Sequence, residues 1–337
     1  MKNKIVLYFG LAIIAIVIIF LLYFNYLIGT TPVDKEIVFE VRKGQSTEQI
    51  IDELNKYGYL QPKTLYYYFI GFIKIKDNSY LQAGYYKFPA KISNFELINS
   101  LLEGKNLYSI KVTLPEGKNI FEYASIFKNK LNIDSTEFIN MAMNTEFLQK
   151  NKIQVNSAEG YIFPSTYQFV PNVSVRKILS TLINEQNSRW KESYDQQASA
   201  LGFNKHQILT LASIIEAETT VADERAKVSG LYHNRLRKGM LLQADPTVQY
   251  AIGRKDRVLK SDLRINNPYN TYINAGLPPG PINSPSINSI IATLYPEEHN
   301  YLFMVAKNDG SGLHNFAENY REHLKFVNQF RKSRRNK

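Results

Sequence analysis

The sequence contains no cysteine among its 337 residues. Disulfide bonds, thiolate metal sites and a cysteine nucleophile are therefore excluded, so the fold must depend on packing and hydrogen bonding alone. Tryptophan occurs once, and no low-complexity tract interrupts a composition that is 44% hydrophobic and 21% charged. Such a composition is typical of a globular protein, and the length allows two or three modest domains.

Histidine is scarce as well, and the five histidines show no His-x-x-x-His spacing. That spacing places two zinc ligands on one face of a helix in many metalloproteases. A metalloprotease is therefore disfavoured, and we expect neither a metal nor a cofactor. The histidines are His206, His233, His299, His314 and His323.

The net charge of +11 is concentrated partly at the two ends. Lys2 and Lys4 precede an apolar run, and residues 329–337 form a basic tail. A basic balance suits nucleic acid, anionic lipid or a polyanionic cell wall, so charge alone does not identify the partner. For the tail we expect a solvated, disordered end.

Residues 5–24 form an unbroken apolar and aromatic run, which continues to residue 28 with only Asn25 as a strongly polar interruption. Twenty such residues in a helix rise about 30 Å, enough to span a bilayer. The two preceding lysines place the N-terminus in the cytoplasm and the remainder outside. We therefore expect residues 1–29 to be a cytoplasmic N-terminus and single-pass anchor of the inner membrane. A cleaved signal peptide is the alternative, although Gly29-Thr30-Thr31 makes a poor cleavage site. Nucleic-acid binding is disfavoured for an exported domain.

Residues 34–105 are predicted to form a β-α-α-β-α module. Two capping boxes, Ser46 with Gln49 and Ser93 with Glu96, mark helix starts, and Gly104 is a typical helix-ending glycine. The expected elements are strands at 37–41 and 84–88 and helices near 47–57, 62–73 and 94–103. The module resembles the LysM-like region of membrane-anchored wall enzymes. A spacer role and a sugar-binding role remain open.

A helix with a carboxylate at its end is predicted from Asn204, whose side chain and that of Gln207 form another capping box. Its apolar stripe consists of Ile208, Leu211, Ala212 and Ile215. Glu218 continues this stripe, whereas Glu216 falls one face round and is expected to be exposed. We therefore expect Glu216→Gln to have a mild effect.

Burial disfavours the charged form of a carboxyl group, so the pKa of Glu218 should rise. A carboxyl that keeps its proton near neutral pH can protonate a glycosidic oxygen. The alternatives are that Glu218 pairs with a nearby arginine, such as Arg225, or caps the next helix. We expect that next helix to begin with Asp223 as its N-cap and to end with Arg235, Arg237 and Lys238 complementing its dipole.

Several blocks in the last third resemble the YceG-like family of endolytic murein transglycosylases. Their order and spacing hold over roughly residues 201–325, which makes the resemblance specific. The blocks are residues 212–219 (ASIIEAET), 223–225 (DER), 234–236 (NRL), 242–250 (LQADPTVQY), 269–272 (YNTY), 276–282 (GLPPGPI) and 314–316 (HNF).

The resemblance implies that Glu218 is catalytic and that the substrate is the glycan strand of peptidoglycan. It implies cleavage between N-acetylmuramic acid and N-acetylglucosamine within strands, leaving 1,6-anhydro ends. One carboxyl group first gives and then takes a proton, so no second carboxylate is needed, unlike in two-carboxylate glycosidases. The absence of an obvious acidic partner of Glu218 in the sequence agrees with this. Proximity to peptidoglycan synthases, and a role in ending strand elongation, are also implied.

Further substrate-binding candidates are polar or aromatic residues in these blocks and in residues 159–167, where relatives often have Asp in place of Ser165. The alternative for the loop residues is a structural role in a turn, at a helix start or in a loop hydrogen bond. The rigid stretch 277–281 is interpreted as a wall of the groove. The candidates are Glu159, Tyr161, Gln243, Asp245, Thr247, Asn270, Tyr272 and His314.

The predicted fold class is α+β: a transmembrane helix, the LysM-like module, and a mixed α/β catalytic region of the YceG-like type over residues 106–328, with its core at 201–328. Two rival functions remain. One is a non-catalytic, membrane-anchored scaffold that binds peptidoglycan, and the other is a hydrolytic muramidase whose products carry reducing ends.

Overall fold

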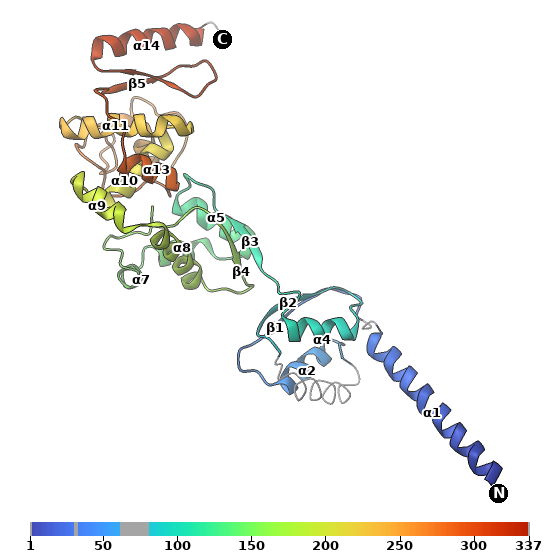
Figure 1. The fold of residues 1–337 in the computed structure, drawn as a ribbon. Coiled ribbons are helices and arrows are strands. Elements are labelled where there is room, and N and C mark those ends of the chain that lie inside the picture. Colours follow the sequence, from blue (N-terminus) through green and yellow to red (C-terminus); the bar gives the residue numbers. More distant parts are fainter. Residues whose placement is uncertain (1, 30–32, 61–80, 336–337) are drawn as a thin grey trace. The chain divides into compact units, whose positions relative to one another are not determined.

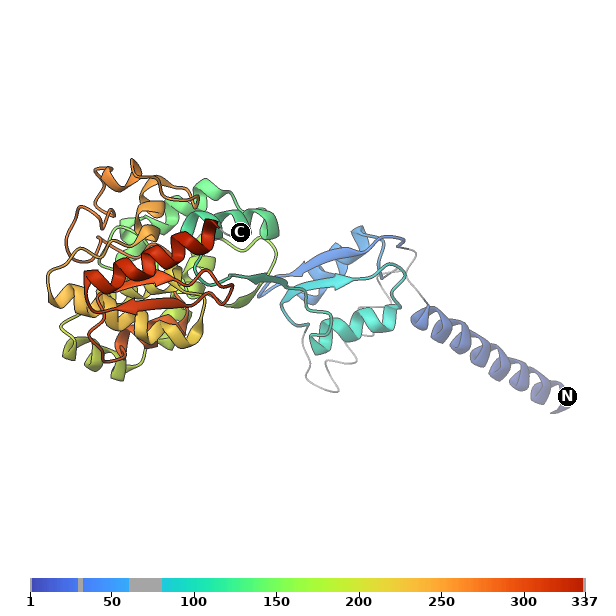
Figure 2. The ribbon, with the colours of Figure 1, turned by 90° about the horizontal axis from the view of Figure 1, so that it is seen from above.

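The computed structural model describes residues 2–29, 33–60 and 81–335 and divides into two compact units. Unit 1 comprises Met1–Ile110 and unit 2 comprises Lys111–Lys337. Figures 1 and 2 show the chain coloured from its N-terminus to its C-terminus. The two units are described separately below.

Unit 1 begins with the helix α1, Lys2–Ile28. The side chains described within it, at residues 8–23, are almost all exposed and predominantly apolar. Over the described part of the chain, no helix has the length and apolar character needed to cross a membrane. The anchor expected at residues 5–28 stays a prediction.

The rest of unit 1 is a two-stranded antiparallel sheet with helices. Strand β1 (Ile37–Val41) pairs with β2 (Gly84–Phe88), with Ile37 opposite Phe88. Helices α2 (Thr47–Lys56) and α4 (Asn94–Glu103) begin at the two predicted capping boxes. These strands and helices confirm the predicted elements, whereas the helix expected at 62–73 lies outside the described residues. The LysM-like character of the module stays a prediction.

Alternating side chains of β1 and β2 and the inner faces of both helices form the core of unit 1. Its largest buried members include Tyr86, Phe88, Ile51 and Leu54. The rings of Tyr86 and Phe88 stack with centroids 5.7 Å apart. The period-two burial of β2 explains why a five-residue strand is stable here, since one face of the two-stranded sheet is covered.

Unit 2 contains most of the helices together with two further two-stranded sheets. One sheet pairs β3 (Ile110–Thr113) with β4 (Thr166–Phe169), and the other pairs β5 (Phe303–Ala306) with β6 (His314–Ala317). The helices are α5 (Ile120–Leu131), α6 (Ser135–Ala142), α7 (Thr145–Lys150), α8 (Val175–Arg189), α9 (Glu192–Ala200), α10 (Lys205–Glu218), α11 (Arg225–Arg237), α12 (Asp245–Ile252), α13 (Ile287–Leu294) and α14 (Tyr320–Arg335), with 3-10 turns η1 (Ala222–Glu224) and η2 (Asp262–Arg264).

Helix α10 lies at the centre of the core that carries the candidate site. It packs against α13 and α11, and Figure 1 shows these three helices together. The buried cluster includes Leu211, Ile215 and Val228, with the side chains of Tyr301 and Phe316 packed against it. The capping box predicted at Asn204 is present, and the apolar stripe of α10 is buried as expected.

Two predictions about helix ends are wrong. Residues 329–335 do not form a disordered end, because α14 continues through Arg335 and packs on β5 and β6. Asp223 is not the N-cap of the next helix; it lies exposed within η1, and α11 begins at Arg225 without a side-chain cap. A 3-10 turn in front of α11 therefore replaces the expected cap.

Candidate active site

Glu218 is the last residue of α10, where Thr219 takes up an extended backbone and ends the helix. The stripe from Ile208 to Ile215 anchors the helix in the core, and Glu218 follows it by three residues. The side chain is half-buried and lines a pocket of about 370 Å³. Sequence periodicity therefore placed it correctly at the edge of the core.

Six parts of unit 2 meet around this pocket. They are the end of α10, the second half of α11, the loop into α12, the loop 269–274, the β5–β6 sheet, and the start of α14. The polar lining residues are Glu218, Tyr232, Arg235, Gln243, Asp245, Tyr272, His314, Tyr320 and His323. The structure thus brings together four of the predicted substrate-binding residues, namely Gln243, Asp245, Tyr272 and His314, with Glu218.

Burial raises the pKa of Glu218 to about 7. The Tyr232 hydroxyl donates a 2.7 Å hydrogen bond to Glu218 Oε1 and acts in the opposite direction, because it favours the carboxylate. Asp245 raises the pKa by charge repulsion, while His314 and Arg235 lower it. A carboxyl group in this environment is present in both protonation states near neutral pH, as an acid that later acts as a base requires.

Asp245 is a second acidic residue in the pocket, which corrects the expectation that Glu218 has no acidic partner. It is exposed at the first turn of α12, and the Tyr272 hydroxyl donates a 2.6 Å hydrogen bond to its Oδ1. The pKa of Tyr272 is raised by burial and by this hydrogen bond, so Tyr272 remains a donor. The pocket therefore contains two carboxyl groups, and each accepts a hydrogen bond from a tyrosine hydroxyl.

His314 at the start of β6 is fixed by Glu224 from η1. One oxygen of the Glu224 carboxylate accepts the backbone N–H of His314 and the other lies 2.8 Å from its Nδ1. Glu224 is buried, so its contact with His314 is shielded from water. Because Nδ1 is engaged, the Nε2 side of the ring is the side available to the pocket.

Tyr232 and Arg235 are site residues that sequence reasoning missed. Tyr232 is buried among the apolar residues of α11, but its hydroxyl reaches Glu218. Arg235 was expected to complement the helix dipole; instead it is 7% exposed and donates to the carbonyls of Leu302, Leu241 and Leu242. The only available signal was the position of Arg235 one turn after Leu231 on the buried face.

Gln243 has a positive φ of 51°, a conformation that non-glycine residues adopt rarely. Its backbone N–H donates to Thr271 O, which holds the loop before α12 against the loop 269–274. Its side chain is exposed at the pocket. Such strained residues accumulate at functional sites, where surrounding structure holds them in place.

Two further candidates, Thr247 and Asn270, lie near the pocket but do not line it. Thr247 is fully buried and bonds to Ala244 O and to the hydroxyl of Thr271. Asn270 is also fully buried, and its amide donates to Leu263 O and Ile265 O. Their polar atoms organise the two loops, and a contact with substrate stays a prediction.

Glu159 and Tyr161 are not brought to the Glu218 pocket either. Glu159 is 2% exposed, accepts hydrogen bonds from Ile120 N and the Tyr250 hydroxyl, and has its pKa raised by burial to about 8. Tyr161 bonds to His206 Nδ1 at 3.0 Å, beside a separate cavity. Both residues lie in the core that supports α5 and α10.

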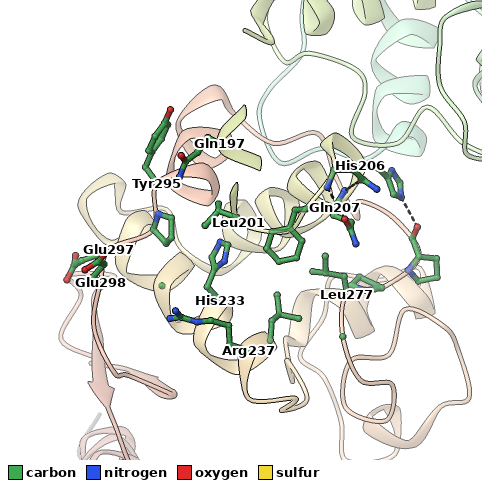
Figure 3. A pocket seen from close by; sticks show the side chains of 18 residues that line it. Gln197, Leu201, His206, Gln207, His233, Arg237, Leu277, Tyr295, Glu297 and Glu298 are labelled. Atoms are coloured by element: carbon green, nitrogen blue, oxygen red, sulfur yellow. Dashed lines mark hydrogen bonds between the residues drawn. The ribbon is translucent and has the colours of Figure 1, made fainter. Parts of the chain in front are cut away.

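The stretch 277–281, expected to be a wall of the groove, borders a different cavity of about 980 Å³ shown in Figure 3. Leu277, Pro278 and Pro279 line that cavity, and Pro279 O lies 2.8 Å from His206 Nε2. The cavity also contacts His233 and Arg237 but not Glu218. The stretch does line a cavity, but this cavity is not the pocket that contains Glu218.

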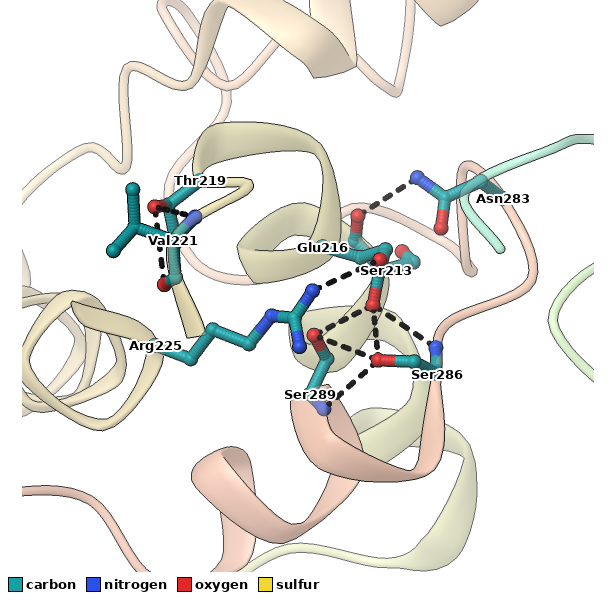
Figure 4. Close-up of polar contacts among 8 residues, drawn as sticks. All are labelled: Ser213, Glu216, Thr219, Val221, Arg225, Asn283, Ser286 and Ser289. Carbon is teal, nitrogen blue, oxygen red and sulfur yellow. Dashed lines mark hydrogen bonds and ion pairs between the residues drawn. The ribbon is translucent and has the colours of Figure 1, made fainter. Parts of the chain in front are cut away.

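Glu216 is buried, contrary to the expectation that it faces solvent. Its side chain is 7% exposed, and its Oε2 accepts from Ser286 N at 3.0 Å, Ser286 Oγ at 2.5 Å and Ser289 Oγ at 2.7 Å (Figure 4). Arg225 Nη2 lies 3.5 Å from the other oxygen. Glu216 therefore fixes the N-terminus of α13, whose cap is Ser286. Arg225 pairs with Glu216, so it is not the partner of Glu218.

Within the described residues, no group of three or more His, Asp or Glu side chains is arranged to bind a metal ion. The chemistry that this pocket offers is proton transfer by one half-buried carboxyl group beside a second carboxylate, an arginine and a histidine. Fold and site together define a candidate acid–base enzyme, whose pocket holds a carboxyl group able to give and take a proton.

The chain belongs to the YceG-like family, whose family model matches residues 39–329. The endolytic murein transglycosylase of Bacillus subtilis is 33% identical over 327 residues, covering 91% of this chain and 89% of the relative. The endolytic murein transglycosylase of Streptococcus pneumoniae D39 is 25% identical over 322 residues, and the match spans 84% of this chain and 58% of that protein. A crystal structure of a YceG-like protein from Listeria monocytogenes superposes with a TM-score of 0.60 at 28% identity, covering 87% of this chain and 99% of that one.

Proposed function

We propose that this protein cleaves the glycan strands of peptidoglycan as a lytic transglycosylase, with Glu218 as the catalytic acid and base. The observation that carries the proposal is the half-buried carboxyl of Glu218 in a pocket, with a pKa raised to about 7. The similarity to two endolytic murein transglycosylases supports the substrate class.

In the proposed reaction, protonated Glu218 gives its proton to the glycosidic oxygen between N-acetylmuramic acid and N-acetylglucosamine as the C1–O bond breaks. The resulting carboxylate then takes the proton of the muramic C6 hydroxyl, whose oxygen bonds to C1. The product is a 1,6-anhydro end, and Glu218 regains its proton without entry of water. The Tyr232 hydroxyl would stabilise the carboxylate stage, because its hydrogen bond favours the charged form.

A hydrolytic muramidase is the second candidate, because Asp245 supplies the second carboxyl group that hydrolysis requires. In that reaction a carboxylate positions a water molecule or attacks C1, and the product carries a reducing end. The Tyr272 hydroxyl donates a hydrogen bond to Asp245 Oδ1 and occupies a lone pair of that oxygen, which hinders it from positioning water or attacking C1. We therefore favour the lytic reaction.

The cellular setting is part of the same proposal. The apolar run at residues 5–28 would anchor the chain in the cytoplasmic membrane, with the pocket outside the cell or in the periplasm. The LysM-like module would act as a spacer or a glycan contact. At such a location the enzyme would act beside peptidoglycan synthases and end the elongation of nascent strands.

Product analysis tests the proposal. The full chain is incubated with purified sacculi, and soluble fragments are analysed by mass spectrometry. Release of anhydro-ended fragments is the expected result. Fragments with reducing ends would establish the muramidase, and binding to sacculi without any fragments would establish a non-catalytic scaffold.

A further inference from the structure

A further cavity of about 740 Å³ borders the chain segments that hold Glu218, and it is distinct from the pocket of Glu218 and from the cavity of Figure 3. Ala217 lines this cavity while Glu218 lines the active pocket, and Pro246 lines it while Asp245 lines the active pocket. Since these are consecutive residues in both cases, the end of α10 and the start of α12 form a ridge between the two cavities. We call the cavity of about 740 Å³ the α5–α12 cavity.

The walls of the α5–α12 cavity are held together by charge. Lys255 Nζ, just beyond α12, lies 2.8 Å from Glu122 Oε2 on α5, and Lys118 Nζ lies 2.7 Å from the other oxygen of Glu122. In addition, the Gly117 N–H donates a hydrogen bond to Ser284 O. The cavity is thus bounded by elements that are tied to one another and to the segment carrying Asn283, so it is a formed feature of unit 2.

The lining combines an aromatic face with amides. Phe121 on α5 is 48% exposed, although Ile120 and Tyr123 in the same turn of that helix are fully buried. Asn283 is 4% exposed, and its amide nitrogen donates to Ser213 O (Figure 4). Gln249 and Asn119 add further amides to the wall.

The shape and chemistry of the substrate favour two occupied cavities. The active pocket, at about 370 Å³, is at the small end of the range for ligand sites, which runs from about 300 to 1,000 Å³. An enzyme that cuts within a polymer gains rate from contacts with parts of the substrate remote from the reacting bond. A pyranose ring offers apolar C–H faces to an aromatic ring and hydroxyl or acetamido groups to amides.

We propose that the α5–α12 cavity is a subsite for an N-acetylated sugar of the same glycan strand, on the far side of the ridge from the scissile bond, with Phe121 as its stacking platform. This inference rests on the proposed function, because it assumes that the ligand in the active pocket is a glycan strand. The occupant is a saccharide unit of that strand, because the lining offers an aromatic ring and amides.

The experiment compares Phe121→Ala with a matched control, Tyr295→Ala. Tyr295 is also 48% exposed, but it lines the separate cavity of Figure 3. For each variant of the full chain, kcat/KM is measured on long glycan strands and on the shortest fragment that the wild type cuts. With Phe121→Ala we expect a loss of about three- to tenfold on long strands, the size of an aromatic contact, and no change on the shortest fragment. Phe121→Tyr keeps the ring and should restore wild-type rates.

Equal rates for Phe121→Ala and wild type on long strands, or equal losses on long and short substrates, would overturn the subsite. A separate binding measurement keeps the subsite apart from the catalytic proposal. Co-sedimentation with sacculi is compared for Glu218→Gln and for Glu218→Gln combined with Phe121→Ala, and weaker binding by the double variant is expected. If the wild type cuts nothing but this binding difference is seen, the catalytic proposal fails while the subsite stands.

Discussion

Two glutamates two residues apart, Glu216 and Glu218, end the same helix in opposite environments. Both side chains are shielded from bulk water, but the oxygens of Glu216 accept hydrogen bonds from three donors on Ser286 and Ser289 and face Arg225. Glu218 receives one hydrogen bond, from Tyr232, and otherwise faces a pocket. Burial alone therefore does not distinguish a reactive carboxyl from a structural one. The difference lies in how many of its lone pairs the protein already satisfies.

The largest expected effect is the loss of cleavage in Glu218→Gln. The amide can neither give nor take the proton, so the rate on sacculi should fall at least about a thousandfold, within the usual contribution of an acid–base group. The thermal unfolding temperature should stay within a few degrees of wild type, since the Tyr232 hydroxyl can still donate to the amide oxygen. Wild-type cleavage by this variant would show that the carboxyl of Glu218 is not the acid.

Glu216→Gln should instead act on stability, which reverses the mild effect expected from the sequence. Removing one charge of a buried ion pair costs about 3 kcal/mol, because Arg225 is left without its partner. Unfolding of unit 2 can be followed by the fluorescence of Trp190, the single tryptophan. Glu146→Gln, an exposed glutamate on α7, is the control and should unfold like wild type. If the two variants unfold alike, the Glu216 network contributes nothing.

Glu224→Gln tests the residue that orients the imidazole ring of His314, which is a different role from supplying the acid. The carboxylate of Glu224 places one oxygen at the backbone N–H of His314 and the other at its Nδ1, and the amide keeps only one oxygen. The ring should therefore lose its fixed position, and cleavage should fall about ten- to a hundredfold. The effect should vanish when Glu224→Gln is combined with His314→Ala, because the residue it orients is then absent. Additive losses in the double variant would mean that Glu224 acts by another route.

The smallest effects are opposite shifts of the pH profile. The acid form of Glu218 starts the reaction, so kcat/KM should decline as pH rises through about 7. Tyr232→Phe removes the hydrogen bond that lowers the pKa of Glu218, so the decline should move to higher pH. Asp245→Asn removes the repulsion that raises this pKa, so the decline should move to lower pH. Shifts in the same direction in both variants would contradict the assigned environment.

Local rules located much of the fold and the carboxyl at the end of α10. The capping boxes at Ser46, Ser93 and Asn204 depend on residues three apart, so they can be identified in the sequence. Helical periodicity likewise placed Glu218 on the buried side. It failed for Glu216, because the donors at Ser286 and Ser289 lie about seventy residues away, and no periodicity within α10 records where α13 begins.

The burial of two loop candidates could not be predicted for the same reason. Thr247 and Asn270 are polar loop residues, and polar loop residues often carry function. Their side chains instead satisfy backbone carbonyls of neighbouring loops, which only the folded arrangement reveals. Glu224 was overlooked for the opposite reason: it is one of several charged residues at a helix start, and its partner His314 lies ninety residues further on.

Direct titration of Glu218 tests the central claim most closely. Carbon-13 NMR of the full chain with labelled glutamate side chains would follow its carboxyl carbon with pH, and the resonance missing from Glu218→Gln identifies it. We predict a midpoint near pH 7, because the pocket disfavours the charged form. A midpoint near 4.5, the ordinary value for a glutamate, would mean that Glu218 is already ionised at neutral pH, and it could not then serve as the acid that begins strand cleavage.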